Sequence, residues 1–559
     1  MSKDIRQLTI PSTIQDVIMA RVDSLPERAK EVLQAGAVVE REFPHKLIDR
    51  IMGLPEKELL SHLSVLKDTE LLYERGVFPQ SSYIFKHALT REVVYGSILT
   101  SKKKKLHEEI GNAIEELCRG NMSEQFEALA GHYFLGEIYS KAAEYSRLAS
   151  KKAEKAASLS DAITQTKKRL ASIERLPRIK DVEIQLIDAR VTLGLYLSQM
   201  NCHVEAKETV DPITDLAVRH DYKKRLCQIY TIIGAHHFTV EENYANAFQV
   251  SEAALKISEE SKDIVASLFT SVWLGTMTGW NCEFERSAYY CQKALKINME
   301  VNNLWGIAAT KSLLALCSYY YRGEIDLSFN TTMEALSTAE ESGDIYSNVV
   351  TCVAHGNSCI GKGFLWEAEK HLLRGVEFCE RINLPAWHFN ARFYLGEIYF
   401  ESMNFAKSKE QYDKAILILE TSRILPSWAS LARVGFARSK VMNKEKDVNL
   451  ESLPVYSRSN KVKVLEGLIQ RYIGEIFLNV DDQHFSEAEH WIHEAIEADR
   501  RNGMMLDLGR DHALCAELFK RTGNRSKFQT HLGKAIELYK ECGAEGWLKK
   551  AEEEFATPS

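Results

Sequence analysis

The sequence predicts a mainly α-helical protein, in which a long α-solenoid of stacked helix pairs follows a smaller N-terminal domain. The first observation is a column of seven glycines that recur at intervals of about 40 residues, with one doubled gap. Leu316 stands in this column within the doubled gap. The glycines are Gly194, Gly234, Gly275, Gly356, Gly396, Gly435 and Gly474. Fixed-period self-similarity of this length is typical of repeat arrays.

Composition is the second observation. Only 11 prolines in 559 residues favour a mostly helical chain, because proline breaks helix interiors. The net charge of −7 gives no reason to expect nucleic acid or a membrane as partner. The 11 cysteines are scattered without a Cys-x-x-Cys pair, which favours a reducing, cytoplasmic location without disulfides or a zinc site. No apolar run is long enough to predict a membrane span.

After a tail over residues 1–10, residues 11–122 are expected to form a winged-helix-like domain. Three amphipathic segments predict helices, each with a proline at its start: Pro26–Val39, Pro44–Met52 and Pro55–Lys67. Two segments around a turn predict the strands of a hairpin: Leu71–Arg75 and Ser82–Phe85. Three helices followed by a β-hairpin are the elements of a winged helix.

Winged helices often bind DNA through the third helix. Here the charges across residues 55–70 sum to −2, whereas contact with phosphates and bases requires cationic or amide side chains. DNA binding is therefore disfavoured.

The repeat unit is clearest around Gly396. Its first helix is expected to carry Phe393, Leu395, Gly396 and Tyr399, and its second helix Ser408, Tyr412 and Ala415. This pattern resembles the tetratricopeptide repeat (TPR), with Leu-Gly-x-x-Tyr in one helix and Ala-x-x-x-Phe-x-x-Ala in the next. Small residues let the two backbones approach, while an aromatic ring fills the space between them.

The array is expected over residues 181–555, as about nine TPR-like helix pairs with a period of about 40 residues. Residues 123–180 are expected to form a helical connector that contains further TPR-like helices. The unit at Gly435 is degraded, and a loop is expected over residues 443–460 around Pro454.

The concave face of a solenoid, carried by the first helix of each pair, is the expected surface for a protein or small-ligand partner. Candidate residues on it are Thr276, Trp280, Cys317, Tyr320, Asn357, Glu397 and Phe400. The alternative for each is an ordinary core or surface position.

Several spaced motifs precede the array. One runs from Ile10 to Leu25 (IPSTIQDVIMARVDSL), and another from Phe85 to Tyr95 (FKHALTREVVY). They are followed by Leu106-His107 and by Ala128–Tyr133 (ALAGHY). In this order they resemble the segment after the ATPase core in bacterial multidomain adenylate/guanylate cyclase–ATPase–TPR regulators, which are signal-transduction ATPases with numerous domains. Over residues 10–175 the resemblance rests on individual motifs. Over the rest of the chain it rests only on the type of repeat.

The resemblance implies that the winged helix couples to a nucleotide-switch ATPase core. In related switches a winged-helix histidine contacts the phosphate of the bound nucleotide, and His87 occupies a comparable place. The alternative is a histidine bonded structurally where the wing meets the next helix.

No Gly-x-x-x-x-Gly-Lys-Ser/Thr loop is present, so neither a catalytic residue nor a cofactor is predicted in this chain. We expect a non-catalytic signalling regulator or scaffold. The alternative is the C-terminal part of an ATP-dependent signalling enzyme, an ATPase with or without a cyclase, that works only with its missing N-terminal part.

His236-His237 with Glu241-Glu242 is a conceivable metal site. Adjacent histidines on a helix point about 100° apart, and the acids are expected across a turn. No metal is therefore predicted.

Overall fold

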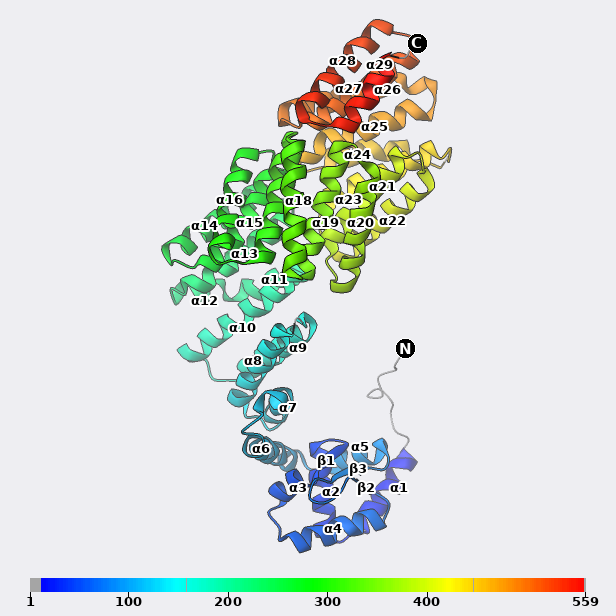
Figure 1. The fold of residues 1–559 in the computed structure, drawn as a ribbon. Coiled ribbons are helices and arrows are strands. Elements are labelled where there is room, and N and C mark those ends of the chain that lie inside the picture. Colours follow the sequence, from blue (N-terminus) through cyan, green and yellow to red (C-terminus); the bar gives the residue numbers. More distant parts are fainter. Residues whose placement is uncertain (1–11, 157, 446, 557–559) are drawn as a thin grey trace. The chain divides into compact units, whose positions relative to one another are not determined.

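The computed structural model describes residues 12–156, 158–445 and 447–556, and it divides into two compact units that meet in sequence at Tyr196 and Leu197. The first unit begins with five helices and three strands (Figure 1). These elements are α1 (Ser12–Asp23), α2 (Glu27–Val39), β1 (Glu42–Pro44), α3 (His45–Met52), α4 (Glu56–Asp68), β2 (Leu72–Arg75), β3 (Ser82–Phe85) and α5 (Ala88–Ser97). The three predicted helices and both predicted strands are thereby confirmed within two residues at each end.

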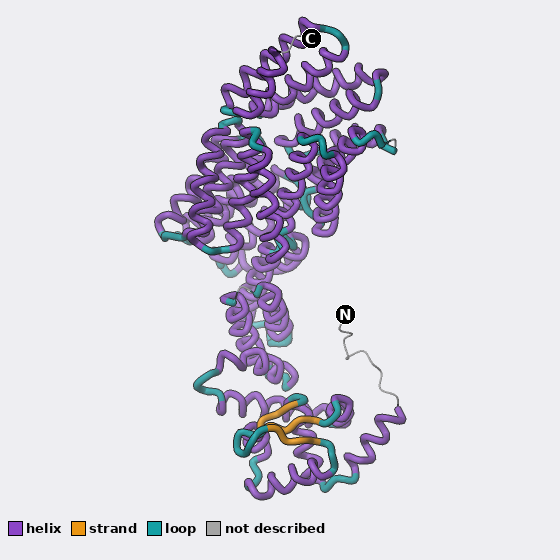
Figure 2. The backbone as a smooth tube through the Cα atoms, turned by 45° about the vertical axis from the view of Figure 1, so that its right-hand side comes forward, coloured by secondary structure: helices purple, strands orange, loops and turns teal. Residues whose placement is uncertain are grey.

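The small sheet contains one strand that the sequence did not predict. β1 pairs antiparallel with β3, so the strand order is β1-β3-β2, seen in orange in Figure 2. Glu42 faces Ile84 in the register, and Phe43 faces Tyr83. With only three residues, β1 is too short to show the alternation that identifies a strand in a sequence. Phe43 and Phe85 are buried in a core shared with α2 and α4.

More helices complete the first unit and lead into the second. They are α6 (Thr100–Leu117), the 3₁₀ turn η2 (Met122–Gln125), α7 (Phe126–Leu135), α8 (Tyr139–Lys155), α9 (Leu159–Ile173) and α10 (Lys180–Gln199). None of the helices that the structure describes combines the length and hydropathy needed to cross a membrane.

The second unit is an array of helix pairs. Its first part comprises α11 (His203–Val210), η3 (Asp211–Ile213), α12 (Thr214–Arg219), α13 (Lys223–Thr239), α14 (Tyr244–Glu260), α15 (Ile264–Trp280), α16 (Phe284–Glu300), α17 (Leu304–Leu314), the π-helical η4 (Ala315–Tyr320), α18 (Ile325–Ser342), α19 (Ile345–Lys362) and α20 (Leu365–Ile382). The second part comprises α21 (Pro385–Glu401), α22 (Phe405–Ser422), α23 (Pro426–Met442), η5 (Leu450–Ser452), α24 (Leu453–Ser459), η6 (Lys463–Leu465), α25 (Glu466–Val480), η7 (Asp482–His484), α26 (Phe485–Asn502), α27 (Met505–Arg521), α28 (Arg525–Cys542) and α29 (Glu545–Ala556).

The predicted period and the mainly helical fold class are confirmed. From α13 to α27 the first helix of each pair begins about 40 residues after the one before it. Among the described residues, eight pairs run from α13/α14 to α27/α28. One further unit precedes these eight in the sequence: α10 begins about 40 residues before α13 and is followed by α11 and α12. The total agrees with the predicted count of about nine.

Local signals in the sequence explain where these helices begin and end. Side chains of Asn or Asp accept a hydrogen bond from the backbone N–H three residues later, which caps the start of a helix. Among the described α-helices of the second unit, the caps of this kind are Asn243, Asp263, Asp344, Asn404 and Asn524. Four of these α-helices end at a glycine in the left-handed region, where a side chain would be strained: Gly343, Gly363, Gly503 and Gly543.

The segment after α23 differs from its expectation. The sequence predicts a loop over residues 443–460, but this segment holds η5 and the short helix α24, in which Pro454 lies in the first turn. A proline is tolerated there, because the first N–H groups of a helix have no intrahelical partner. The second helix of this unit is therefore shortened rather than replaced by a loop.

Tyr412 of α22 shows why the glycine column exists. A Cβ atom on Gly396 of α21 would lie 3.0 Å from the Tyr412 ring, and one on Gly435 of α23 would lie 2.7 Å from it. Tyr412 is fully buried, so its ring cannot give way. The glycines of two neighbouring units thus allow one ring to fill the space between three helices.

We predict that Gly435→Ala destabilises the protein by about 1–3 kcal/mol, because overpacking against the ring outweighs the better helix propensity of alanine. Gly533→Ala is the matched control. Gly533 is also in a helix, α28, but an added Cβ meets nothing within 4 Å. This variant should be neutral or slightly stabilising. Thermal and urea unfolding of both variants checks the prediction, and equal effects would contradict it.

Candidate functional site

Segments far apart in the sequence close the second unit on itself. The indole N–H of Trp547 in α29 donates a hydrogen bond of 2.7 Å to the carbonyl oxygen of Ile360 in α19. Lys362 forms an ion pair of 2.8 Å with Glu545. Gly363 and Gly546 approach so closely that a Cβ on either would lie 2.8–3.0 Å from the backbone of the other.

A second closing contact lies between the connection from α13 to α14 and the start of α23. The buried carboxylate of Glu242 accepts hydrogen bonds from the backbone N–H of Ser427 at 3.0 Å and from its hydroxyl at 2.5 Å. The backbone N–H of Leu425 donates to the carbonyl oxygen of Thr239 at 2.7 Å. Trp280 and Trp428 pack together, with ring centroids 5.3 Å apart. The first helices of distant repeat units therefore face one another.

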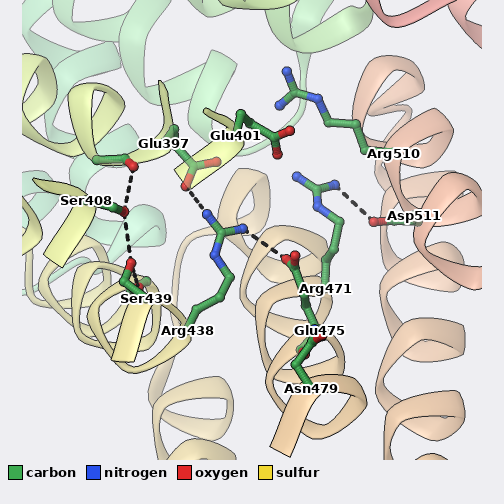
Figure 3. A network of polar contacts seen from close by, with 12 residues as sticks. Glu397, Glu401, Ser408, Arg438, Ser439, Arg471, Glu475, Asn479, Arg510 and Asp511 are labelled. Carbon is green, nitrogen blue, oxygen red and sulfur yellow. Dashed lines mark hydrogen bonds and ion pairs between the residues drawn. The ribbon is translucent and has the colours of Figure 1, made fainter. Parts of the chain in front are cut away.

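Arg438 of α23 lies at the centre of a polar network in this interior (Figure 3). Its guanidinium donates to Glu397 of α21 at 2.5 Å and to Glu475 of α25 at 3.1 Å. The same group lies 3.7 Å from the ring centroids of both Phe400 and Tyr472. Its side chain is only 3% exposed. The arginine is thus held between two carboxylates and two aromatic faces, a cation–π geometry that orients it rigidly.

The network continues through Arg471 of α25. Its guanidinium contacts Asp511 of α27 at 3.0 Å and Asp507 at 2.8 Å, and Asp499 of α26 lies 4.0 Å away. Figure 3 also shows Arg510 of α27 near Arg471. Arg510 lies over the ring of Trp547, at 4.8 Å from the centroid, so it joins the network to the closing contact of α29.

Carboxyl groups outnumber guanidinium groups in this interior. Loss of water raises the pKa of Asp511 to about 7 and raises that of Glu475 above its ordinary value. Burial also raises the pKa of Asp499, and the negative charges of Asp511 and Asp507 raise it further. Both oxygens of Asp499 and one oxygen of Asp511 have no hydrogen-bond partner among the described residues. The interior therefore favours additional protons or another positive charge.

The space left beside the network is small. A cavity of about 20 Å³ is lined by aromatic residues and by Glu397, Asp507 and Arg510. The aromatic residues include Tyr320, Tyr321, Tyr394, Trp428 and Tyr472. This volume holds about one water molecule. A ligand larger than water does not fit in this cavity as it stands.

The structure brings together three of the seven residues predicted to bind a partner. Glu397 and Phe400 contact Arg438, and Tyr320 lines the adjoining cavity. All three are buried by the chain itself, not exposed on an open concave face.

The other four predicted residues lie away from the network. Trp280 packs on Trp428 at the closing contact, and the half-buried Thr276 donates to a carbonyl of its own helix. Cys317 is buried beside Cys291, and Asn357 is buried with its amide donating to Asn390 at 3.2 Å.

Sequence reasoning missed the arginines of the site. Arg438 stands three residues after Gly435, in the column that holds Tyr399 after Gly396 and Phe477 after Gly474. A charged residue in a column otherwise held by aromatic residues could have identified Arg438. Glu475 directly follows Gly474, just as the predicted site residue Glu397 directly follows Gly396, so the same position in the repeat could have identified Glu475.

Two nucleotide-related features can be placed. His87 is exposed immediately before α5, and its backbone carbonyl accepts from Thr90 at 3.0 Å. The string from Gly356 to Gly363 (GNSCIGKG) differs from a phosphate-binding loop by glycine in place of Ser or Thr. It lies inside α19 up to Lys362, where the backbone N–H groups bond within the helix and cannot cradle a phosphate.

No protein-family model matches this chain, and no curated protein matches it. Solved structures do match. A Rap protein in complex with competence and sporulation factor is 14% identical, over 73% of this chain and 99% of that chain, with a TM-score of 0.44. Human IFIT1 with m7Gppp-AAAA is 14% identical, over 71% and 90% of the two chains, with a TM-score of 0.38.

A third match is a signal-transduction ATPase with numerous domains and a tetratricopeptide repeat sensor, from Pyrococcus horikoshii. It is 12% identical, over 99% of this chain and 68% of that chain, with a TM-score of 0.33. At these identities the likeness to all three concerns the helical-repeat fold alone.

We predict that Arg438→Met destabilises the second unit by about 3–5 kcal/mol, because it leaves the buried Glu397 and Glu475 without a counter-charge. Arg374→Met is the matched control, since Arg374 pairs with Glu340 at 2.9 Å but both side chains are about half exposed. Its loss should be about 0–1 kcal/mol. Urea unfolding followed by circular dichroism measures both. The triple variant E397Q/R438M/E475Q should regain much of the loss, and comparable losses for R438M and R374M would contradict the prediction.

A second prediction concerns pH. Because the pKa of Asp511 is raised from 3.8 to about 7, the folded state binds this proton more tightly than the unfolded chain. The resulting stabilisation is complete below about pH 4 and is lost as the pH rises through 7. The free energy of unfolding of the wild type minus that of D511N should therefore fall by about 1–4 kcal/mol between pH 4 and pH 8. The variant D413N, at an exposed position of α22, provides the baseline against which this fall is measured. A difference for D511N that is flat or rises with pH would refute the assignment.

Proposed function

We propose that this chain is a non-catalytic regulatory protein or scaffold whose TPR-like second unit binds a protein segment or a small ligand in its interior. The observation that carries the proposal is the charged network around Arg438, placed on the first helices of successive units and covered by closing contacts. Solenoids bind partners along the surface that these helices form.

Energetics support a binding role for the network. A buried ion pair contributes little net stability, since removing both partners from water offsets most of their attraction. Three guanidinium groups and a larger number of carboxyl groups are therefore an unfavourable way to fill a core. In an opened array the same groups would offer hydrogen-bond donors, acceptors and aromatic faces to an extended peptide or a charged ligand.

The contacts that cover the network combine polar bonds with an apolar core that includes Trp428 and Trp547. They include one indole hydrogen bond, the Lys362–Glu545 pair and the Glu242–Ser427 bonds. A ligand that binds the open array better than the closed one would shift the population toward the open form. Regulation would then consist of this opening.

For the first unit we propose coupling to a nucleotide-switch ATPase core that lies outside this chain. The motifs over residues 10–175 support it, together with the exposed position of His87, which is accessible to a phosphate. The same features support the alternative that the chain is the C-terminal part of an ATP-dependent signalling enzyme.

A disulfide lock tests the binding proposal. A Cβ atom added to Gly323 would lie 2.8 Å from the sulfur of Cys542, which is close to the Cβ-to-sulfur distance of about 3 Å in a disulfide. Gly323→Cys should thus join the connection before α18 to the end of α28 under oxidising conditions. We expect phage-displayed random peptides that enrich on the wild type to bind reduced G323C, and to bind the oxidised form at least tenfold more weakly.

Gly343→Cys is the control, because Gly343 has a similarly positive φ but no atom near an added Cβ. Its binding should not depend on the redox state. Peptide enrichment that is equal on locked and unlocked chains would argue against binding in the interior. So would a wild type that enriches no peptide family.

A further inference from the structure

The end of α13 places two histidines and a carboxylate together. The helix ends at Thr239, and the chain reverses at Glu242, whose φ is +50°. Glu241, just before the reversal, turns its side chain back toward His236 and His237 in the last turn of the helix. His237 and Glu241 are four residues apart, the spacing that places two side chains on the same side of a helix.

Both imidazoles direct the same ring nitrogen at this carboxylate. The Nδ1 atom of His237 lies 2.7 Å from one oxygen of Glu241, and the Nδ1 atom of His236 lies 3.5 Å from the other. The three ligand atoms all lie within 4.8 Å of one another. Among the described residues, no other group of three or more histidine, cysteine or acidic side chains meets this condition.

His236 supplies an independent observation. It is only 8% exposed, and its Nδ1 atom has no hydrogen-bond partner among the described residues. A buried ring nitrogen without a hydrogen-bond partner is uncommon, because its loss of hydration is not compensated by a hydrogen bond within the protein. This atom faces the Glu241 carboxylate at a distance too long for a good hydrogen bond but suited to a shared ion.

We propose that His236, His237 and Glu241 form a binding site for a divalent transition-metal ion of the zinc type. Two imidazoles and one carboxylate are a common ligand set for zinc, with the fourth position left to water. Ligand atoms about 2.0–2.1 Å from a tetrahedral ion lie about 3.4 Å apart. The His236 pair, at 3.5 Å, has this spacing. The 2.7 Å contact of His237 is to the other carboxylate oxygen, so ion binding requires the Glu241 side chain, which is 41% exposed, to rotate.

The charges around the site permit a cation. Lys207 is the neighbouring positive group, and it is paired with Asp211 at 2.5 Å. The ammonium of Lys461 bonds to the backbone carbonyl of Glu241 and leaves the carboxylate to the histidines. Glu241 and Glu242 also line a surface hollow, through which an ion could enter, together with Asn243, Tyr244 and Lys461.

This proposal departs from the expectation drawn from the sequence. Neighbouring histidines on a helix do point about 100° apart, but a carboxylate at the helix end has two oxygens and meets one ring with each. The expected turn, which reverses the chain at Glu242, brings that carboxylate back to the helix instead of separating it from the histidines.

Titration of the full-length chain with ZnCl₂ tests the site, after removal of metal with EDTA and with a chromophoric chelator as competitor. The wild type should bind one Zn²⁺ ion that E241Q and H237N bind at least tenfold more weakly. Co²⁺ in place of Zn²⁺ should give the visible absorption of a tetrahedral site in the wild type and lose it in both variants. Circular dichroism establishes that the variants are folded, and Glu241 is exposed enough for its replacement to leave the fold intact.

His484→Asn is the matched control. His484 lies 2.7 Å from a carboxylate oxygen of Asp481, as His237 does from Glu241, but its site contains no second histidine among the described residues. H484N should bind Zn²⁺ as the wild type does. Unchanged affinity in both E241Q and H237N would overturn the proposal, and so would a loss of affinity in H484N as large as theirs.

Discussion

Close approach of paired helices is the constraint on which the second unit depends. Gly396 and Gly435 leave room for the ring of Tyr412, so three consecutive helices of two repeat units share one buried side chain. Any larger residue in these positions would force the backbones apart. Close approach recurs at other glycines of the column, where an added Cβ atom would meet a different residue of the paired helix: Ser251, Cys291, Leu372 or Ile492.

The surface that the first helices form does not stay open to water. Regular stacking of helices of similar length brings units that are far apart in the sequence into contact, where Trp547 bonds to Ile360 and Glu242 bonds to Ser427. Closure takes Arg438, Arg471 and their carboxylates out of water together. The closed form therefore combines polar contacts at its edges, an apolar core that includes Trp428 and Trp547, and a charged interior.

The two closing regions differ in chemistry. At α29 an aromatic side chain, two glycines and the Lys362–Glu545 ion pair form the contact. At the end of α13 two neighbouring acids make different contacts. Glu241 faces the histidine pair, and Glu242 accepts a hydrogen bond from Ser427. An ion bound at the proposed site would act on the same short reversal that positions Glu242.

Periodic features were predictable from the sequence. The glycine and alanine columns specify the helix pairs, their regular spacing and their approximate number, since each depends on local packing that repeats. The predicted helices and hairpin of the first unit were likewise read from patterns of a few residues. Of the interior site, Glu397, Phe400 and Tyr320 were predictable because their place relative to the glycine column assigns them to the inner face.

Tertiary structure alone decided whether that face is open or closed, and which charges meet on it. Arg438 and Glu475 come from different units than Glu397, and Trp547 bonds to Ile360 in a unit far back along the chain, so no local pattern relates them. β1 was missed because three residues are too few to show the alternation of a strand. The return of Glu241 to the histidines was missed because it depends on the geometry of the turn after α13. The sequence by itself determined a mainly helical array of paired helices and its period, because those rest on contacts between neighbouring helices. The polar interior and its closure rest on contacts between distant ones, whose free energy exists only once the chain has folded.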